Sequence, residues 1–197
     1  MSFRGVAVLG SAIVRRVSVV GNSGSGKSTL ARELAAALGV PHVELDGVFH
    51  QPDWVPLPED EFRRVVGAAT AGAGWVMDGN YSAVRPIVWA RADTVVWLDL
   101  PRRTVMRQVV WRTLRRAVTR QELWNGNREP VRNFLTWVPE ESVISWAWHN
   151  HAKYRERYLA AAADPGNAHL TFVRLASRRA ICSFLTEAER GFGQATA

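Results

Sequence analysis

The sequence predicts an α/β fold in which a five-stranded parallel sheet, in the order 2-3-1-4-5, is flanked by helices. Short runs rich in β-branched residues alternate with longer segments of helical period, which is typical of a parallel sheet covered by helices. The first run leads directly into a glycine-rich turn and then a helix. At 197 residues, the whole chain (1–197) fits one domain.

The elements follow from local patterns in chain order. The predicted strands are residues 16–20, 42–45, 75–77, 94–98 and 169–174. The predicted helices cover residues 28–38, a segment beginning at Pro58, and residues 102–119, 139–163 and 178–190. Gly39 ends the first helix, and Pro58 begins the second with three acidic residues after it. Residues 1–14 are expected to form an extension, and residues 122–139 a loop or insertion.

Several side chains are expected in the core. Packing positions are Val105, Val109, Leu114 and Val118 on one helix, with Trp97, Trp146 and Trp148. Cys182 lies in an apolar run and is expected to be buried and inert. Because it is the only cysteine, an internal disulfide is excluded and a reducing cytoplasm is the expected location.

Composition excludes disordered and fibrous classes, since 47% of residues are hydrophobic and 22% are charged. The net charge is +7, and Lys27 and Lys153 are the only lysines among 25 basic residues. Residues 102–132 contain nine arginines and two glutamates, so this segment holds the entire excess. A basic excess of this kind suggests an anionic partner.

A phosphate-binding loop is the sharpest motif, matching G-x-x-x-x-G-K-[ST] in full. Its residues are Gly21, Asn22, Ser23, Gly24, Ser25, Gly26, Lys27, Ser28 and Thr29. The glycines let backbone N–H groups point at phosphate oxygens, at the positive end of the next helix. Lys27 would reach the β- and γ-phosphates of ATP, and Ser28 would ligate Mg²⁺. The hydrophobic strand before the loop and the helix after it argue against a flexible linker.

Acidic residues follow three of the predicted strands. Glu44 and Asp46 end the second strand beside the loop, and point the same way if that strand continues. Asp78 and Asp99 follow the next two strands; Asp99 is predicted to direct Mg²⁺. A carboxylate there can orient Mg²⁺ or accept a proton from an acceptor hydroxyl. Each aspartate could instead be a cap or turn residue.

The sequence lacks motifs that are typical of several other classes of phosphate-loop protein. The sequence has no Asn-Lys-x-Asp motif for guanine, and it lacks the further motifs of transporters and helicases. A small kinase is the remaining common class, in which a phosphoryl acceptor binds opposite the nucleotide.

The order GNSGSGKST, ELDGVFHQPDW, WVMDGNY and ADTVVWLDLPR resembles the adenylate-kinase-related subfamily often labelled topology modulation proteins. The resemblance runs from about Val17 to the closing helix. It implies a kinase fold, with Asp78 as the acid of the Mg²⁺ and phosphate site. Arg85 corresponds only in part, because it is displaced from the arginine of the Asp-Gly-Phe-Pro-Arg pattern of adenylate kinases. Glu44 and Asp46 also resemble the acidic pair of small-metabolite kinases such as shikimate kinase.

The arginine segment has three interpretations. Arg112, Arg116 and Arg120 share one side of a helix with Arg115 adjacent, and a lid over residues 120–139 would bring positive charge to a transferring phosphoryl group. Arg128 and Arg132 would then lie at the lid tip. A solvated helix face is the plain alternative. Binding to nucleic acid, with Trp111, Trp124 and Trp137 stacking on bases, is the other.

The sequence therefore predicts a cytoplasmic kinase that transfers the γ-phosphoryl of Mg·ATP to a small acceptor, with a nucleoside or nucleotide as the candidate. The predicted catalytic residues are Lys27, Asp46, Asp78, Arg112 and Arg116. The predicted acceptor-binding residues are Glu44, Asp46, Trp54, Asp78 and Arg85, with His50 and Trp137 as weaker candidates. The competing classes are a nucleic-acid-associated or regulatory ATPase and a nucleotide-binding protein without turnover. No membrane partner is expected.

Overall fold

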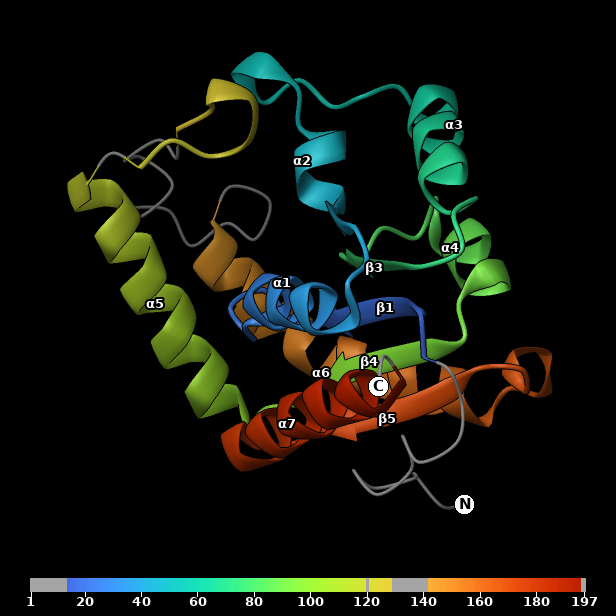
Figure 1. The fold of residues 1–197 in the computed structure, drawn as a ribbon. Helices are drawn as coiled ribbons and strands as arrows, with labels where there is room; N and C mark the ends of the chain where they lie inside the picture. Colours follow the sequence, from blue (N-terminus) through green and yellow to red (C-terminus); the bar gives the residue numbers. More distant parts are fainter. Residues whose placement is uncertain (1–13, 120, 129–141, 196–197) are drawn as a thin grey trace.

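The sheet is all-parallel and has five strands in the order β2-β3-β1-β4-β5, which confirms the predicted topology (Figure 1). The computed structural model describes residues 14–119, 121–128 and 142–195. The strands are β1 (Arg16–Gly21), β2 (His42–Glu44), β3 (Trp75–Asp78), β4 (Thr94–Leu98) and β5 (Thr171–Leu175). β1 is central, so the loop that follows it emerges in the middle of the sheet's carboxyl edge.

Helices connect the strands in the order expected for a doubly wound sheet. They are α1 (Lys27–Leu38), α2 (Leu45–Phe49), α3 (Glu59–Ala69), α4 (Arg85–Arg91), α5 (Arg102–Thr119), α6 (Val143–Ala163) and α7 (Arg178–Ala195). Short 3-10 turns are η1 (Pro52–Trp54), η2 (Trp124–Gly126) and η4 (Pro165–Asn167). Within the described residues, no helix is long and apolar enough to cross a membrane.

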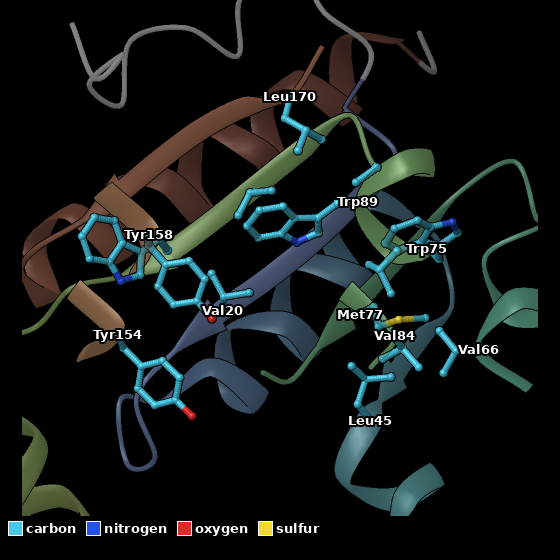
Figure 2. Packing of buried hydrophobic residues seen from close by; sticks show 14 of the residues in the cluster. Val20, Leu45, Val66, Trp75, Met77, Val84, Trp89, Tyr154, Tyr158 and Leu170 are labelled. Carbon is cyan, nitrogen blue, oxygen red and sulfur yellow. The ribbon is translucent and has the colours of Figure 1, made fainter. Parts of the chain in front are cut away.

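The core has two halves because alternate strand residues point to opposite faces of the sheet. On one face, Val17 and Val19 pack with residues of α1 and α7. On the other, Val20, Trp75 and Trp97 pack with residues of α3, α4 and α6 (Figure 2). Both faces are therefore covered, as a parallel sheet requires.

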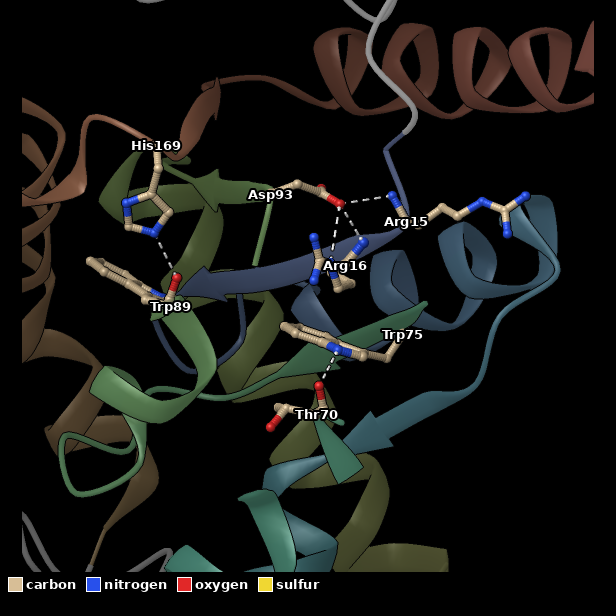
Figure 3. Close-up of polar contacts among 7 residues, drawn as sticks. All are labelled: Arg15, Arg16, Thr70, Trp75, Trp89, Asp93 and His169. Atoms are coloured by element: carbon tan, nitrogen blue, oxygen red, sulfur yellow. Dashed lines mark hydrogen bonds and ion pairs between the residues drawn. The ribbon is translucent and has the colours of Figure 1, made fainter. Parts of the chain in front are cut away.

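Polar contacts fasten the amino-terminal edge of the sheet, opposite the phosphate loop (Figure 3). The carboxylate of Asp93 accepts hydrogen bonds from the backbone N–H groups of Arg15 and Arg16, at 3.1 and 2.8 Å. The Trp75 indole donates to the Thr70 carbonyl at 3.2 Å, and His169 contacts the Trp89 carbonyl at 3.0 Å. These contacts tie β1, β3 and β4 to the segments beside them at the edge where the strands begin.

Several core predictions are wrong. Val105 and Val109 are buried, but Leu114 and Val118 are 51% and 84% exposed. Trp97 is buried as expected, whereas Trp146 and Trp148 are both exposed, and so is Cys182. The helical period located the buried side of α5 near the sheet. The period alone cannot indicate at which residue the helix passes the end of the sheet. Figure 1 shows that α5 extends beyond the sheet.

Candidate functional site

The phosphate loop lies between β1 and α1, as predicted, and its shape depends on glycine. Gly24 and Gly26 have positive φ angles of 78° and 91°, which side chains rarely tolerate. A Cβ on Gly24 would come within 2.8 Å of Cβ of Val109, so α5 lies directly against the loop. Gly26 caps α1, and the first N–H groups of that helix therefore face the loop.

Asn80 fixes the start of the loop from the neighbouring strand connection. Its amide donates to the Gly21 carbonyl at 2.6 Å and accepts from the Gly21 N–H at 3.3 Å. The Tyr158 hydroxyl of α6 donates to the same Asn80 oxygen at 2.9 Å. Burial raises the pKa of that hydroxyl, which keeps it protonated as a donor. From the loop itself, Asn22 donates to the Ala147 carbonyl of α6 at 2.7 Å.

Asp78 joins the loop to the sheet. This aspartate ends β3 and is 1% exposed. One carboxylate oxygen accepts from the Ser28 hydroxyl at 2.6 Å, and the other contacts Nε2 of His42 at 2.9 Å. Glu44 is the register partner of Asp78 on β2. Lys27 is half-buried beside Ser28, and within the described ranges its ammonium has no hydrogen-bond or ion-pair partner.

Asp46 lies on a different element than expected. The second strand ends at Glu44, so the prediction that it continues through Leu45 is wrong, and Asp46 lies in the first turn of α2. The Tyr81 hydroxyl donates to Asp46 at 2.7 Å. Burial and the negative charge of Asp46 raise the pKa of Tyr81, so the phenol stays protonated. His50 Nε2 lies 3.4 Å from the same hydroxyl, and burial lowers the pKa of this imidazole.

The arginine helix reaches the phosphate loop through one of the predicted residues. Arg112 donates to the Ser23 hydroxyl at 3.2 Å. Arg116 lies one turn further along α5 and is half-buried. The two arginines share a side of the helix, so the structure brings at least one of the predicted cationic side chains to the predicted nucleotide site.

The other predicted site residues are more scattered. Trp54 lies in η1, where its ring is 5.2 Å from that of His50 and 6.4 Å from that of Trp124. Arg85 begins α4 and lines a depression of about 350 Å³ between α4 and η4, with its guanidinium over Trp89 at 5.7 Å. The Arg85 atom Nη2 is buried without a hydrogen-bond partner in the described residues.

Asp99 is held by arginines. It is 5% exposed, pairs with Arg174 of β5 and lies 3.6 Å from Nε of Arg155. The structure thus brings Asp78, and not Asp99, into contact with Ser28. Direction of Mg²⁺ by Asp99 stays a sequence-based prediction.

Some predictions lie outside the described residues. These are Arg120, Arg132, Trp137, the extension over residues 1–13 and most of the lid over residues 120–139. In residues 14–119, 121–128 and 142–195, no group of three or more His, Cys, Asp or Glu side chains could hold a metal ion by itself.

Sequence reasoning missed several residues of the site. His42, Asn80 and Tyr81 belong to motifs that were recognised, but their pairing needs the sheet order and the fold of α2. Asn125 and Asn127 follow the arginine helix and contact the segment around Trp54. Their only sequence signal was a polar, glycine-containing stretch, which equally indicates an ordinary loop.

Comparison with known proteins supports the fold. No protein-family model matches the chain, and no curated protein matches it. A shikimate kinase from Acinetobacter baumannii in complex with shikimate is similar, with a TM-score of 0.54 and 17% identity over 92% of this chain and 94% of that chain. A shikimate kinase from Bacteroides thetaiotaomicron has a TM-score of 0.50 and 15% identity over 90% and 97%. A gluconokinase from Sinorhizobium meliloti 1021 has a TM-score of 0.49 and 20% identity over 94% and 95%. With its phosphate loop and its strand order, the chain has the fold of the P-loop shikimate kinases that it resembles.

Proposed function

We propose that this protein is an ATP-dependent phosphotransferase that acts on a small acceptor. The observation that carries the proposal is the pairing of Ser28 with Asp78 at 2.6 Å, next to Lys27 and a glycine-built phosphate loop. The fold likeness to two shikimate kinases agrees with it. Asp46 supplies a candidate base for an acceptor hydroxyl, and the Tyr81 hydroxyl orients it.

The residues fit a magnesium ion in their chemistry. Ser28 and Asp78 offer a hydroxyl and a carboxylate oxygen, the hard ligands that Mg²⁺ prefers, and would hold the ion together with oxygens of the substrate and water. A bound Mg²⁺ would neutralise charge on the β- and γ-phosphates.

The chain's own residues would divide the remaining work. The loop N–H groups and the start of α1 hold the phosphates, and Lys27 places positive charge between the β- and γ-phosphates. Asp46 accepts the proton of the acceptor hydroxyl while the acceptor oxygen bonds to the γ-phosphorus. The bond between the γ-phosphorus and the β–γ bridging oxygen breaks, and ADP leaves. Tyr81 orients Asp46 by donating to one carboxylate oxygen, which leaves the other free to face the acceptor. Arg112 stabilises the charge on the transferring group.

A turnover assay with a panel of acceptors tests the proposal. ATP consumption in the presence of Mg²⁺ is measured with nucleosides, nucleotides, sugar acids and shikimate-like hydroxy acids, and at least one should stimulate it. Lys27→Ala should lower the stimulated rate by about 10²-fold or more, because charge neutralisation in the transition state is lost. Lys153→Ala is the matched control, since the other lysine is exposed on α6.

Two results would contradict the proposal. One is a Lys27→Ala variant that binds and consumes ATP like the wild type. The other is stimulation by DNA or RNA and by no small acceptor, with affinity that falls steeply as salt rises, which identifies a nucleic-acid-dependent ATPase. Binding of ATP without consumption under any condition would point to a nucleotide-binding protein instead.

A further inference from the structure

The turn that presents Trp54 has an unfavourable backbone conformation. Asp53 and Trp54 have φ angles of 59° and 60°, so two consecutive residues other than glycine are left-handed. Residues with a Cβ adopt this conformation rarely, because the Cβ comes close to the following carbonyl oxygen. A short turn keeps this conformation only where its surroundings hold it. We call residues 46–55, which include Asp46 and this turn, the acceptor segment.

The buried side-chain amide of Asn127 contacts both ends of the turn. Asn127 is 4% exposed. Its Oδ1 accepts from the Trp54 backbone N–H at 2.9 Å, and its Nδ2 donates to the Gln51 carbonyl at 2.8 Å. The two bonds fix both ends of the turn, and both use backbone atoms of the acceptor segment. Asn127 thus recognises the shape of this segment rather than its side chains.

Neighbours of Asn127 make further contacts with the acceptor segment. Nδ2 of Asn125 donates to the carbonyl of Gly47 at 3.1 Å and to that of His50 at 2.5 Å. The Trp54 indole donates to the Arg128 carbonyl at 3.1 Å. The Trp124 ring lies so close to Gly47 that a Cβ there would be 2.8 Å from its Cδ1. We call residues 122–128 the clamp segment.

The clamp segment is itself a closed turn. The Leu123 N–H donates to the Asn127 carbonyl at 2.7 Å, and Glu122 and Arg128 form an antiparallel bridge. Figure 1 shows this segment, in yellow, meeting the segment that follows α2, in cyan. It can therefore act as one unit on the acceptor segment.

The helix that precedes the clamp segment, α5, contacts the phosphate loop. The clamp segment follows α5 closely in sequence, and α5 lies against Gly24 through Val109 and donates from Arg112 to Ser23. The middle of α5 thus contacts the phosphate loop, and the clamp segment, which contacts the acceptor segment, begins three residues after this helix ends.

We propose that the clamp segment couples nucleotide binding to the order of the acceptor segment, with Asn127 as the positioning residue. The inference rests on the proposed function, because it takes the phosphate loop as the nucleotide site. Nucleotide binding would reduce the mobility of the phosphate loop and α5, and therefore that of the clamp segment that follows α5. The hydrogen bonds of Asn127 would then stabilise the conformation of the turn at Asp53 and Trp54. An acceptor then meets Asp46 and Trp54 already in place, which lowers the entropic cost of its binding.

Hydrogen exchange of the full chain, measured by mass spectrometry with and without Mg²⁺ and a non-hydrolysable ATP analogue, tests the coupling. In the wild type, the analogue should slow exchange in residues 21–29 and, about tenfold, in residues 47–55. In Asn127→Ala, protection of residues 21–29 should persist while protection of residues 47–55 falls below about twofold. Gln121→Ala, an exposed position just before the clamp segment, should behave as the wild type.

The readouts separate the two claims. No protection of residues 21–29 in the wild type contradicts the proposed function. Protection of residues 21–29 without protection of residues 47–55 contradicts only the coupling. Full protection of residues 47–55 in Asn127→Ala shows that Asn127 does not transmit the effect, and overturns its assignment.

A second variant keeps the test decisive if Asn127→Ala does not fold. Asn127→Asp retains the bond accepted from the Trp54 N–H and loses the bond donated to Gln51. In Asn127→Asp, the analogue should slow exchange in residues 47–55 less than in the wild type but more than in a variant that lacks both bonds. Protection equal to that of the wild type would contradict the role of the amide.

Discussion

Asp78 shows how one side chain can organise a site. It is almost fully buried, and its two carboxylate oxygens contact the first turn of α1 and the edge strand β2. A carboxylate in that position is tolerated only because both oxygens are hydrogen-bonded. The motif around it could be recognised in the sequence, but the partnership with His42 could not, since the two residues lie on separate strands.

His50 gives a prediction about pH at the same scale. Burial lowers its pKa from the ordinary 6.5, against the opposing effect of the negative charge of Asp46. In the unfolded chain the imidazole takes up a proton at its ordinary pKa, so the unfolded state binds more protons as the pH falls through this range. Stability should therefore decrease as the pH falls below about 6.5.

Thermal unfolding at about pH 7.5 and about pH 5.5 measures the effect. His50→Gln should reduce the loss of melting temperature at the lower pH, whereas His149→Gln, at an exposed position on α6, should leave that loss as it is in the wild type. An unchanged loss in His50→Gln would show that His50 does not contribute.

At the scale of elements, α5 packs into the core and also contacts the phosphate loop. Its first half is buried through Val105 and Val109, and Arg112 follows within one turn and contacts the phosphate loop. The arginine rows and the extent of this helix could be predicted from the sequence, because a single helical period covers them. The exposure of Leu114 could not, because it depends on where the sheet ends.

Replacement of Arg112 separates a catalytic role from a docking role. Arg112→Gln should lower kcat by about tenfold or more and change the affinity for ATP much less, because the cation is needed most when charge develops on the transferring group. Arg115→Gln, exposed on the same helix, is the control and should keep both values. Equal losses in kcat and in ATP affinity would leave Arg112 only a docking role.

The acceptor segment shows why local pattern was insufficient at this scale. The alternation of Glu44 and Asp46 favoured a longer strand, yet the chain turns into α2 after Glu44. Leu45 is buried there against Gly79, where a Cβ would come within 2.7 Å of Cβ of Leu45. This contact is long-range in sequence, so the periodicity of a few residues carries no signal for it.

Across the whole molecule, the five strands and their order could be predicted, because hydrophobic runs, a single crossover sense and the central phosphate loop restrict the topology. The net charge of +7 could be assigned to one segment. The ion-pair partners of individual charged residues could not be predicted from the sequence. Asp99 was predicted as a metal-directed carboxylate, and it lies between two arginines from β5 and α6.

Those arginines make Asp99 important for the stability of the whole sheet. Asp99→Asn should lower the free energy of unfolding by about 1–3 kcal/mol, measured by urea denaturation, because it leaves Arg174 partly buried beside a neutral partner. Glu61→Gln, which removes an ion pair on the surface of α3, is the control and should have no measurable effect. A stable Asp99→Asn protein would show that the arginines find equivalent partners.

The hydrogen bond between Ser28 and Asp78 has a directional consequence. A hydroxyl has one proton, and Ser28 uses its O–H to donate a hydrogen bond to Asp78. What remains on its oxygen is a pair of lone pairs, which can accept but cannot donate. The start of α1 therefore presents N–H donors to an anion and, at Ser28, an acceptor to a cation. Through this one bond, strand β3 orients the Ser28 hydroxyl at the start of α1, and the proposed function predicts that a cation would meet its lone pairs while an anion would meet the N–H groups.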